Sequence, residues 1–256
     1  MWFRRDLRVH DLPALAHAAG GPVIPCFVFD ERLLTAGRFV SPTRVRFMIG
    51  CLADLRSSLR DRGSDLIVRF GHPESVLPEL ATSAGAQRVH WTADVSPWAV
   101  WRDQRVEAAL DAAGIGHHSH PGSYIVDDPG AIVSGKGTPY TVYSPFYKAW
   151  LEVERREMED APDSILTPDG IDGGALPSIA DLGLNGQAAE TSFDPGETAG
   201  REAARAYLND GLSDYGKNRN NPAGGSSRLS PYMRWGCVSA LELEIKLGLR
   251  EGKGPR

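Results

Sequence analysis

The chain has 256 residues, of which 41% are hydrophobic, and a formal net charge of −5, so it can form one large domain or two modest ones with a substantial core. Its three cysteines form no Cys-x-x-Cys pair, which argues against a zinc site and favours a reducing cytoplasm. No apolar stretch approaches the length of a membrane span, and the N-terminus lacks the apolar core of a signal peptide, so a soluble cytoplasmic protein without a membrane partner is expected.

Strands and helices are predicted to alternate through the first half of the chain. Residues 1–3 read as the end of a strand, and short apolar strands are predicted at 22–29, 65–70, 88–95 and 117–126. Helices are predicted between them at 41–62, 73–84 and 97–113. This alternation predicts an α/β domain over residues 1–128 with a doubly wound parallel sheet covered on both faces. The chain contains no Gly-x-Gly-x-x-Gly, so a standard dinucleotide pocket is not expected.

Residues 129–200 are predicted to connect this domain to a second one. Ser144 is expected to cap a helix that runs through Arg156. Residues 157–200 then contain ten acidic side chains, no basic ones, four prolines and seven glycines, which is typical of a linker that wraps over a surface. Helices are predicted again at 197–208 and 239–249, and residues 201–256 read as the beginning of an all-helical domain.

The end of the chain is basic and carries a distinctive run of small residues. Residues 201–256 have a net charge of +4 against −9 for residues 1–200, which places any nucleic-acid contact in this segment unless the surplus is ordinary surface variation. Ser230 is predicted to cap a helix with Pro231 at its first position. Backbone amides at that helix end, with the hydroxyls of Ser226 and Ser227 and the Arg228 guanidinium, suit a phosphate. The alternative interpretation is a capped helix after a polar surface loop.

Two other polar clusters are candidates for a functional site. The arginines of the run Arg-Arg-Asp-Leu-Arg at residues 4–8 follow the first strand, where α/β folds place ligands, although a solvated charge run fits equally. Of the histidines at 117, 118 and 120, only His118 and His120 share a face of a strand, and no cysteine or carboxylate accompanies them. No metal site is therefore expected.

Two motifs of this chain resemble the DNA photolyase and cryptochrome family. The run Trp-Phe-Arg-Arg-Asp-Leu-Arg-Val-His-Asp at residues 2–11 is similar to the first motif of that family. Tyr-x-x-x-Arg at 215–219, with Ser-Arg-Leu-Ser-Pro-Tyr-x-x-Trp-Gly at 227–236, is similar to the opening of its flavin-binding domain. The resemblance covers nearly all of the chain but only about the first half of the family. It implies an antenna domain over 1–128, a connector over 129–200 and a truncated all-α FAD-binding domain over 201–256.

The resemblance implies which residues of the tail meet FAD and DNA. Contacts with FAD near its phosphates are implied for Tyr215, Ser226, Ser227, Arg228, Leu229 and Ser230. Arg219 is implied to face damaged DNA, and Lys217 and Arg234 would extend that basic surface. The implied enzyme is a deoxyribodipyrimidine photolyase, a lyase that is a monomer when complete and whose reduced FAD donates an electron, under light, to a flipped-out cyclobutane pyrimidine dimer. Its catalytic residues are expected beyond residue 256.

The resemblance also implies a second, light-harvesting chromophore. Family members that use folate carry a carboxylate where this chain has Ala99, so a deazaflavin or flavin is expected in preference to folate. Asp94 and the strand end Phe29-Asp30 would line its pocket, near Arg5. Trp98 and Trp101 stand where deazaflavin users commonly have tyrosine and arginine, and packing along one helix face accounts for both.

Two alternatives to repair remain open from the sequence. One is a cryptochrome-type flavin photoreceptor without repair activity, against which Arg219 and the basic tail argue. The other is an inactive fragment that retains only the antenna fold. The 256 residues alone are not expected to hold FAD firmly or to repair DNA, because the helices that would close over FAD are expected beyond residue 256. Leu229, Met233, Leu241 and Ile245 are then expected to find nothing to pack against, which would leave the tail frayed.

Overall fold

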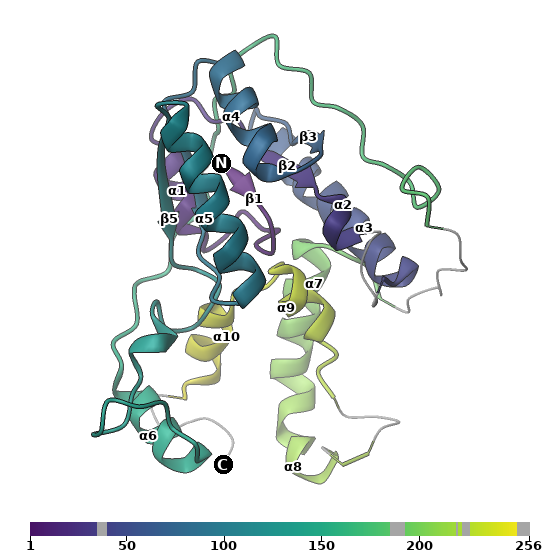
Figure 1. Ribbon diagram of the computed structural model, residues 1–256. Helices are drawn as coiled ribbons and strands as arrows, with labels where there is room; N and C mark the ends of the chain where they lie inside the picture. Colours follow the sequence, from purple (N-terminus) through teal and green to yellow (C-terminus); the bar gives the residue numbers. More distant parts are fainter. Residues whose placement is uncertain (35–39, 185–192, 219, 222–225, 250–256) are drawn as a thin grey trace.

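The structure, a computed structural model, describes residues 1–34, 40–184, 193–218, 220–221 and 226–249 (Figure 1). Five parallel strands form its centre. β1 (Trp2–Phe3), β2 (Cys26–Phe29) and β3 (Ile67–Phe70) pair in the order β1-β2-β3, and β4 (Arg88–Thr92) pairs with β5 (Gly116–His120). β4 lies beside β1, where Trp2 and Trp91 meet edge to face with ring centroids 6.0 Å apart. The spatial order is therefore β3-β2-β1-β4-β5, and the predicted doubly wound parallel sheet is confirmed.

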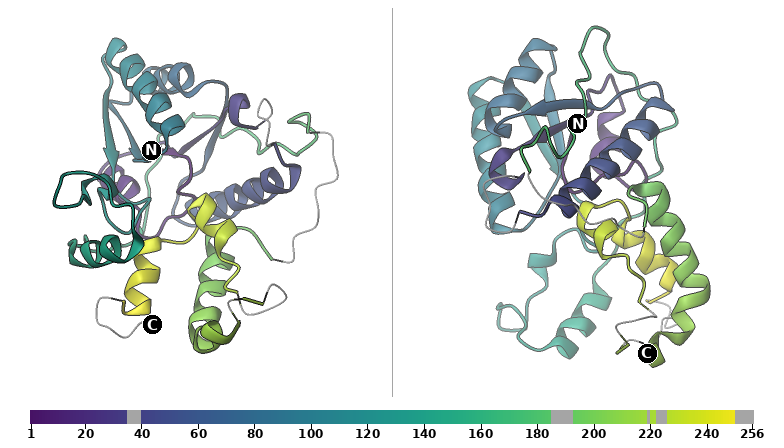
Figure 2. Two further views of the ribbon diagram at one scale, coloured as in Figure 1. Left: turned by 60° about the horizontal axis from the view of Figure 1, so that its bottom comes forward. Right: turned by 90° about the vertical axis from the view of Figure 1, so that its right-hand side faces the viewer.

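Helices cover both faces of the strands, as predicted (Figures 1 and 2). α1 (Pro13–Ala18) and α3 (Pro42–Arg60) pack on one face, and α4 (Pro73–Ser83) and α5 (Pro97–Ala112) on the other, while α2 (Glu31–Leu34) follows β2. Each of α1, α3, α4 and α5 has proline in its first turn, where no intrahelical N–H is lost. Alternation along β2 divides its side chains, since Phe27 and Phe29 face α3 whereas Cys26 and Val28 face α4 and α5.

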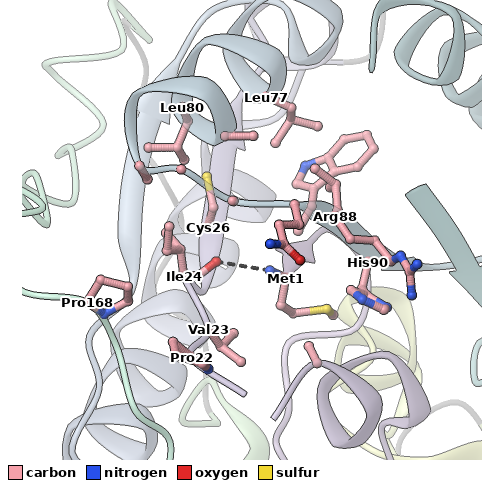
Figure 3. Close-up of a pocket in the computed structure, with 18 residues that line it drawn as sticks. Met1, Pro22, Val23, Ile24, Cys26, Leu77, Leu80, Arg88, His90 and Pro168 are labelled. Carbon is pink, nitrogen blue, oxygen red and sulfur yellow. Dashed lines mark hydrogen bonds between the residues drawn. The ribbon is translucent and has the colours of Figure 1, made fainter. Parts of the chain in front are cut away.

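The three-stranded and the two-stranded sheets separate between β1 and β4. A cavity of about 520 Å³ opens there between Ile24, which precedes β2, and Arg88 and His90 of β4, under Leu77 and Leu80 of α4 (Figure 3). The amino group of Met1 reaches into the gap and donates to the Ile24 carbonyl oxygen at 3.0 Å. β1 and β4 are neighbours without a hydrogen-bonded ladder, so the five strands form one sheet of three strands and one of two.

Short helices follow the α/β body and extend from one side of it (Figure 1). They comprise η1 (Pro129–Ala131), α6 (Tyr143–Glu152), α7 (Glu197–Ala206), a π-helical turn η2 (Tyr207–Gly211), η3 (Leu212–Asp214), α8 (Tyr215–Asn218), α9 (Ser230–Trp235) and α10 (Ala240–Leu247). Two predicted caps are wrong. Ser144 lies inside α6, which begins after the extended Val142, and Ser230 is already helical because Leu229 before it adopts helical backbone angles.

The tail packs on the body more fully than the sequence predicted. Leu229 and Leu241 are buried, whereas Met233 and Ile245 are 37% and 49% exposed. The Tyr232 ring meets Phe47 of α3 with centroids 5.5 Å apart, and its hydroxyl donates to the Asp194 carbonyl oxygen at 2.7 Å. The expectation that all four apolar positions lack partners is thus wrong for Leu229, which joins the core on the α3 face, and for Leu241, which is buried in α10.

The loop after β1 binds the tail to the body through buried charges. The Arg8 guanidinium donates to the carbonyl oxygens of Gly236, Asp11 and Gly122 at 2.8–2.9 Å. The Asp11 carboxylate accepts two bonds from Arg156, at 2.6 and 2.9 Å, and one from the Ser239 hydroxyl. This loop is therefore the common contact of the sheet, the connector and the start of α10.

Gly236→Ala is expected to detach α9 and α10 from this loop. Gly236 has φ +66° and a Cβ there would lie 2.0 Å from the Arg5 carbonyl oxygen, so the free energy of unfolding should fall by roughly 3 kcal/mol. Gly85→Ala is a matched control, since Gly85 has φ +65° but nothing within 4 Å of its Cβ, and strain alone should cost about 1 kcal/mol. Urea unfolding measures both, and equal losses would contradict the proposed close contact.

Histidines on the β4–β5 sheet are expected to make stability fall in mild acid. His90 Nδ1 lies 2.8 Å from His120 Nε2, and burial, aided by nearby His17 and His118, lowers the pKa of both from 6.5 to about 4. Between these values the unfolded chain binds more protons than the folded one. Stability is therefore full above pH 6.5 and should fall as the pH drops to 4, by up to about 3 kcal/mol for each histidine.

Urea midpoints measured across this pH range test that expectation. His120→Gln should flatten the loss, whereas His72→Gln, which alters an exposed histidine outside the cluster, should leave it unchanged. An unaltered slope in His120→Gln would remove the cluster as its cause.

Candidate ligand-binding site

A cavity of about 370 Å³ opens at the carboxyl ends of β1, β2 and β4. Doubly wound sheets bind ligands outside the carboxyl ends of their strands at the position where the strand order reverses, which here lies between β1 and β4. We call this cavity the switch-point pocket. Its lining includes Phe3, Arg4, Arg5, Val28, Asp30, Asp94, Trp98, Ala99, Arg102, Arg234 and Trp235.

Of the three arginines that follow β1, Arg5 is the one whose side chain is substantially exposed, at 41%. Arg4 is buried, donates to the Thr92 carbonyl oxygen and binds the Asp103 carboxylate at 2.5 Å. Arg102 binds the same carboxylate at 2.9 Å, and the two guanidiniums lie 4.7 and 4.9 Å from the Trp2 ring centroid. Arg4 and Arg102 thus build the pocket wall, Arg8 holds the loop, and Arg5 lines the open cavity.

Asp94 forms a fixed carboxylate at the pocket edge. It accepts from Arg5 at 3.2 Å, from the Ser96 amide at 2.9 Å and from the Tyr124 hydroxyl at 3.2 Å. Burial opposes its ionisation, but the Ser96 amide and the positive charge of Arg5 outweigh it and lower the pKa of Asp94. At neutral pH the site therefore offers an oriented hydrogen-bond acceptor beside a cation.

Asp30 lines the pocket, but its charge is already paired. It accepts from Arg32 at 2.6–3.1 Å, and Arg32 also binds Glu74 at 2.8 Å. The Arg32 guanidinium lies 5.6 and 5.7 Å from the ring centroids of Trp98 and Trp101. Asp30 is therefore a structural anion that indirectly orients the aromatic wall.

The remaining residues of the predicted antenna set take different places. Phe29 does not line the switch-point pocket, because its buried ring stacks on Phe70 with centroids 5.1 Å apart. Trp98 and Trp101 do contact each other, at 4.9 Å, as packing along one helix face predicts. They are nevertheless 38% and 42% exposed, and Trp98 lines the pocket, so packing alone does not describe them.

Sequence reasoning missed the contribution of α9 to this pocket. Arg234 and Trp235 line it from a distant part of the chain, and the Arg234 carbonyl oxygen accepts from Arg5 Nε at 3.2 Å. Burial and the positive charge of Arg5 lower the pKa of Arg234. Its guanidinium lies 5.8 Å from the Trp235 ring and has no ion-pair partner among the described residues. Arg234, predicted as a DNA contact, thus presents an unpaired positive charge to this pocket.

The predicted FAD residues lie at the surface of the tail. Tyr215 is 44% exposed, Ser226, Arg228 and Ser230 are exposed, and Ser227 is half-buried. Leu229 is buried in the core. Lys217 is exposed and pairs with Asp214 at 3.2 Å. Arg219 lies outside the described residues, as do residues 222–225 before the serines.

The described residues contain neither a cluster that could bind a metal ion nor a helix that could span a membrane. No group of three or more histidine, cysteine, aspartate or glutamate side chains there is placed to hold a metal ion. Within the same residues, no helix has the length and apolar character needed to cross a membrane.

Comparisons with known proteins agree on one family. The family model for DNA photolyase matches residues 1–164. The chain is 35% identical to an uncharacterised 31.6 kDa protein of Synechococcus sp. (strain PCC 6716), over 93% of this chain and 84% of that protein. It is 38% identical to the deoxyribodipyrimidine photo-lyase of Halobacterium salinarum, over 93% of this chain and 52% of the enzyme. Proteins named cryptochromes also match it.

The fold gives the same answer. A bacterial class III photolyase from Agrobacterium tumefaciens superimposes with a TM-score of 0.86 at 26% identity, covering 99% of this chain and 53% of that one. The chain thus spans about half the length of the photolyases it matches. Because the family model matches most of the chain, and the sequence and structural relatives agree with it, the chain belongs to the DNA photolyase family.

Proposed function

We propose that this chain supplies the light-harvesting part of a flavin-dependent photolyase that repairs cyclobutane pyrimidine dimers in DNA. The observation that carries the proposal is the switch-point pocket, where Arg5 and Asp94 form an oriented pair beneath the unpaired cation of Arg234. Ligand pockets combine apolar and aromatic walls with a few placed polar groups, and this pocket does so. Photolyases generally bind FAD together with an antenna chromophore.

The donor set of the pocket fits a flavin or deazaflavin. Trp98 and Trp235 provide aromatic surface for a planar ring system, and Asp94 accepts from ring or tail N–H and O–H groups. Arg5 and Arg234 donate to carbonyl or phosphate oxygens. Ala99 is buried and offers no carboxylate for a pterin, which disfavours folate. When bound, such a chromophore absorbs light and passes the excitation energy to FAD.

This chain's own residues would hold and orient that chromophore. The Arg4–Asp103–Arg102 cluster fixes the wall behind it, so the pocket is formed before the ligand arrives. Arg5 and Asp94 set the position of one ring edge, because each is held by a second partner and has little rotamer freedom left to lose. The indoles of Trp98 and Trp235 exclude water from the ring faces.

The tail would bring this domain to FAD and DNA. We assign Tyr215 and the run Ser226, Ser227, Arg228, Leu229 and Ser230 to the FAD phosphates, and Lys217 and Arg219 to the DNA backbone. Apart from the buried Leu229, those that the structure describes are exposed or half-buried and so accessible to a partner that arrives later. Arg234 would act in the switch-point pocket. A cryptochrome-type photoreceptor is the second candidate, because cryptochromes match the same residues of the chain.

Arg5→Gln is expected to weaken flavin or deazaflavin binding about tenfold, since it removes a charge-assisted hydrogen bond worth roughly 1.5 kcal/mol. Arg105→Gln is the matched control, because that exposed arginine lies over Trp101 but does not line the pocket. Fluorescence titration with deazaflavin, FMN and folate measures the change. Tight folate binding with no flavin or deazaflavin binding would refute the assignment of this pocket.

A chimera tests repair. Fusing this chain to the remaining half of the Halobacterium salinarum photolyase should give a protein that binds FAD stoichiometrically and repairs dimer-containing duplex in light but not in darkness. The 256-residue chain alone should do neither.

Arg219→Ala in the chimera should weaken binding to that duplex by about 1–3 kcal/mol and reduce its salt dependence. Stoichiometric FAD without repair would favour the photoreceptor instead.

A further inference from the structure

A second polar cavity, of about 490 Å³, lies between α3 and α7 and shares no residue with the switch-point pocket. The end of α3 contributes Ser58, and Arg62 follows one turn later. One face of α7 contributes Thr198, Arg201 and Arg205, which recur at intervals of three and four residues. We call this cavity the α3–α7 groove. The two helices that form its sides contact each other (Figures 1 and 2).

Three guanidiniums line the groove, and each keeps donors unused. Arg62 donates from Nε to the Pro162 carbonyl oxygen at 3.0 Å and from Nη1 to the Ser58 carbonyl oxygen at 2.8 Å. Its Nη2 is left without an acceptor among the described residues. Arg201 is anchored by Nη2 to Glu242 at 3.0 Å, and its buried Nε has no partner among the described residues. Arg205 is exposed and forms no ion pair within the described part of the chain.

The acids near the groove do not satisfy these donors. Glu197 is buried on its floor, but its oxygens accept from the amides of Val9 at 2.7 Å and His10 at 3.2 Å. Glu242 is shared between Arg201 and Lys246, at 3.0 and 2.6 Å. Glu202 stands exposed at the rim. A buried N–H without an acceptor is unfavourable, so an anion that reached the Arg201 Nε would relieve that defect.

We propose that the α3–α7 groove binds a phosphate group as inorganic phosphate or a small phosphate monoester. A tetrahedral dianion can accept from the planar forks of several arginines at once, and the hydroxyls of Ser58 and Thr198 add two further donors. Among the described residues that line the groove, His10 alone has a ring side chain, so the phosphate rather than an attached base is recognised. The site uses no residue assigned above to chromophore, FAD or DNA.

Calorimetric titration of the purified chain with inorganic phosphate, at ionic strength held constant with chloride, tests the proposal. The wild type should bind one phosphate saturably, and Arg205→Gln should weaken it about tenfold. Arg205 carries no described ion pair, so this variant should keep its urea midpoint in chloride. Arg60→Gln is the control, because Arg60 is an exposed arginine two residues before Arg62 that pairs with Asp65 outside the groove.

The outcomes distinguish a specific phosphate site in the groove from nonspecific attraction of phosphate to positively charged side chains. Weakening in Arg205→Gln and in Thr198→Val, with Arg60→Gln unchanged, supports the groove, and competition by glucose 6-phosphate would extend it to monoesters. Absence of saturable phosphate binding, or equal weakening in Arg60→Gln, overturns it. Binding of undamaged duplex DNA that depends on Arg205 without any phosphate binding also overturns it in favour of a backbone contact.

Discussion

The fold depends on two opposite charges, Arg8 and Asp11, that are almost completely buried in the loop after β1. Removing such charges from water is costly, and the cost is offset only because nearly every donor and acceptor is used. Arg8 reaches carbonyl groups of the tail and of the loop after β5, while Asp11, held at φ +50°, gathers Arg156 and Ser239. The Asp11 carboxylate is paired with Arg156 rather than with Arg8, so loss of Arg156 would remove the ion-pair partner of a buried charge. The sheet, the connector and the tail are thus held together by this buried hydrogen-bond network as well as by apolar packing.

Local sequence patterns predicted most of the secondary structure, but not which buried or distant residues meet in the structure. The first four strands and the helices α3, α4 and α5 follow from local periodicity and first-turn prolines, so they could be predicted within a few residues. The short helices α1 and α2 were not predicted, and β5 ends at His120 rather than at residue 126. The site at the strand ends follows from the α/β pattern. Local sequence does not distinguish Arg4 and Arg8, which are buried in structural networks, from Arg5, which faces the pocket. Contacts across more than two hundred residues, such as that between Arg5 and Arg234, carry no local signal.

The tail illustrates the same limit from the side of stability. Isolated helices as short as α9 and α10 are marginal in water, which is why an unpacked tail was expected. In the structure Tyr232, Cys237 and Val238 join the core beneath α3, so tertiary burial supplies what local propensity lacks. The same docking places Arg234 and Trp235 over the switch-point pocket. The pocket therefore joins the α/β body to the helices of the tail, and a ligand held there would contact both.

The division of the sheet beside β1 has a mechanical consequence. β1 and β4 are neighbours but share no hydrogen-bonded ladder, so the body contains two sheets that meet side by side. The switch-point pocket lies at one end of this boundary, with Arg5 after β1 on one side and Asp94 after β4 on the other. The ion pairs Arg4–Asp103 and Arg5–Asp94 connect the two sides. Side chains rather than backbone hydrogen bonds therefore set the width of the pocket, and a substitution at either ion pair would change that width without breaking a strand pairing.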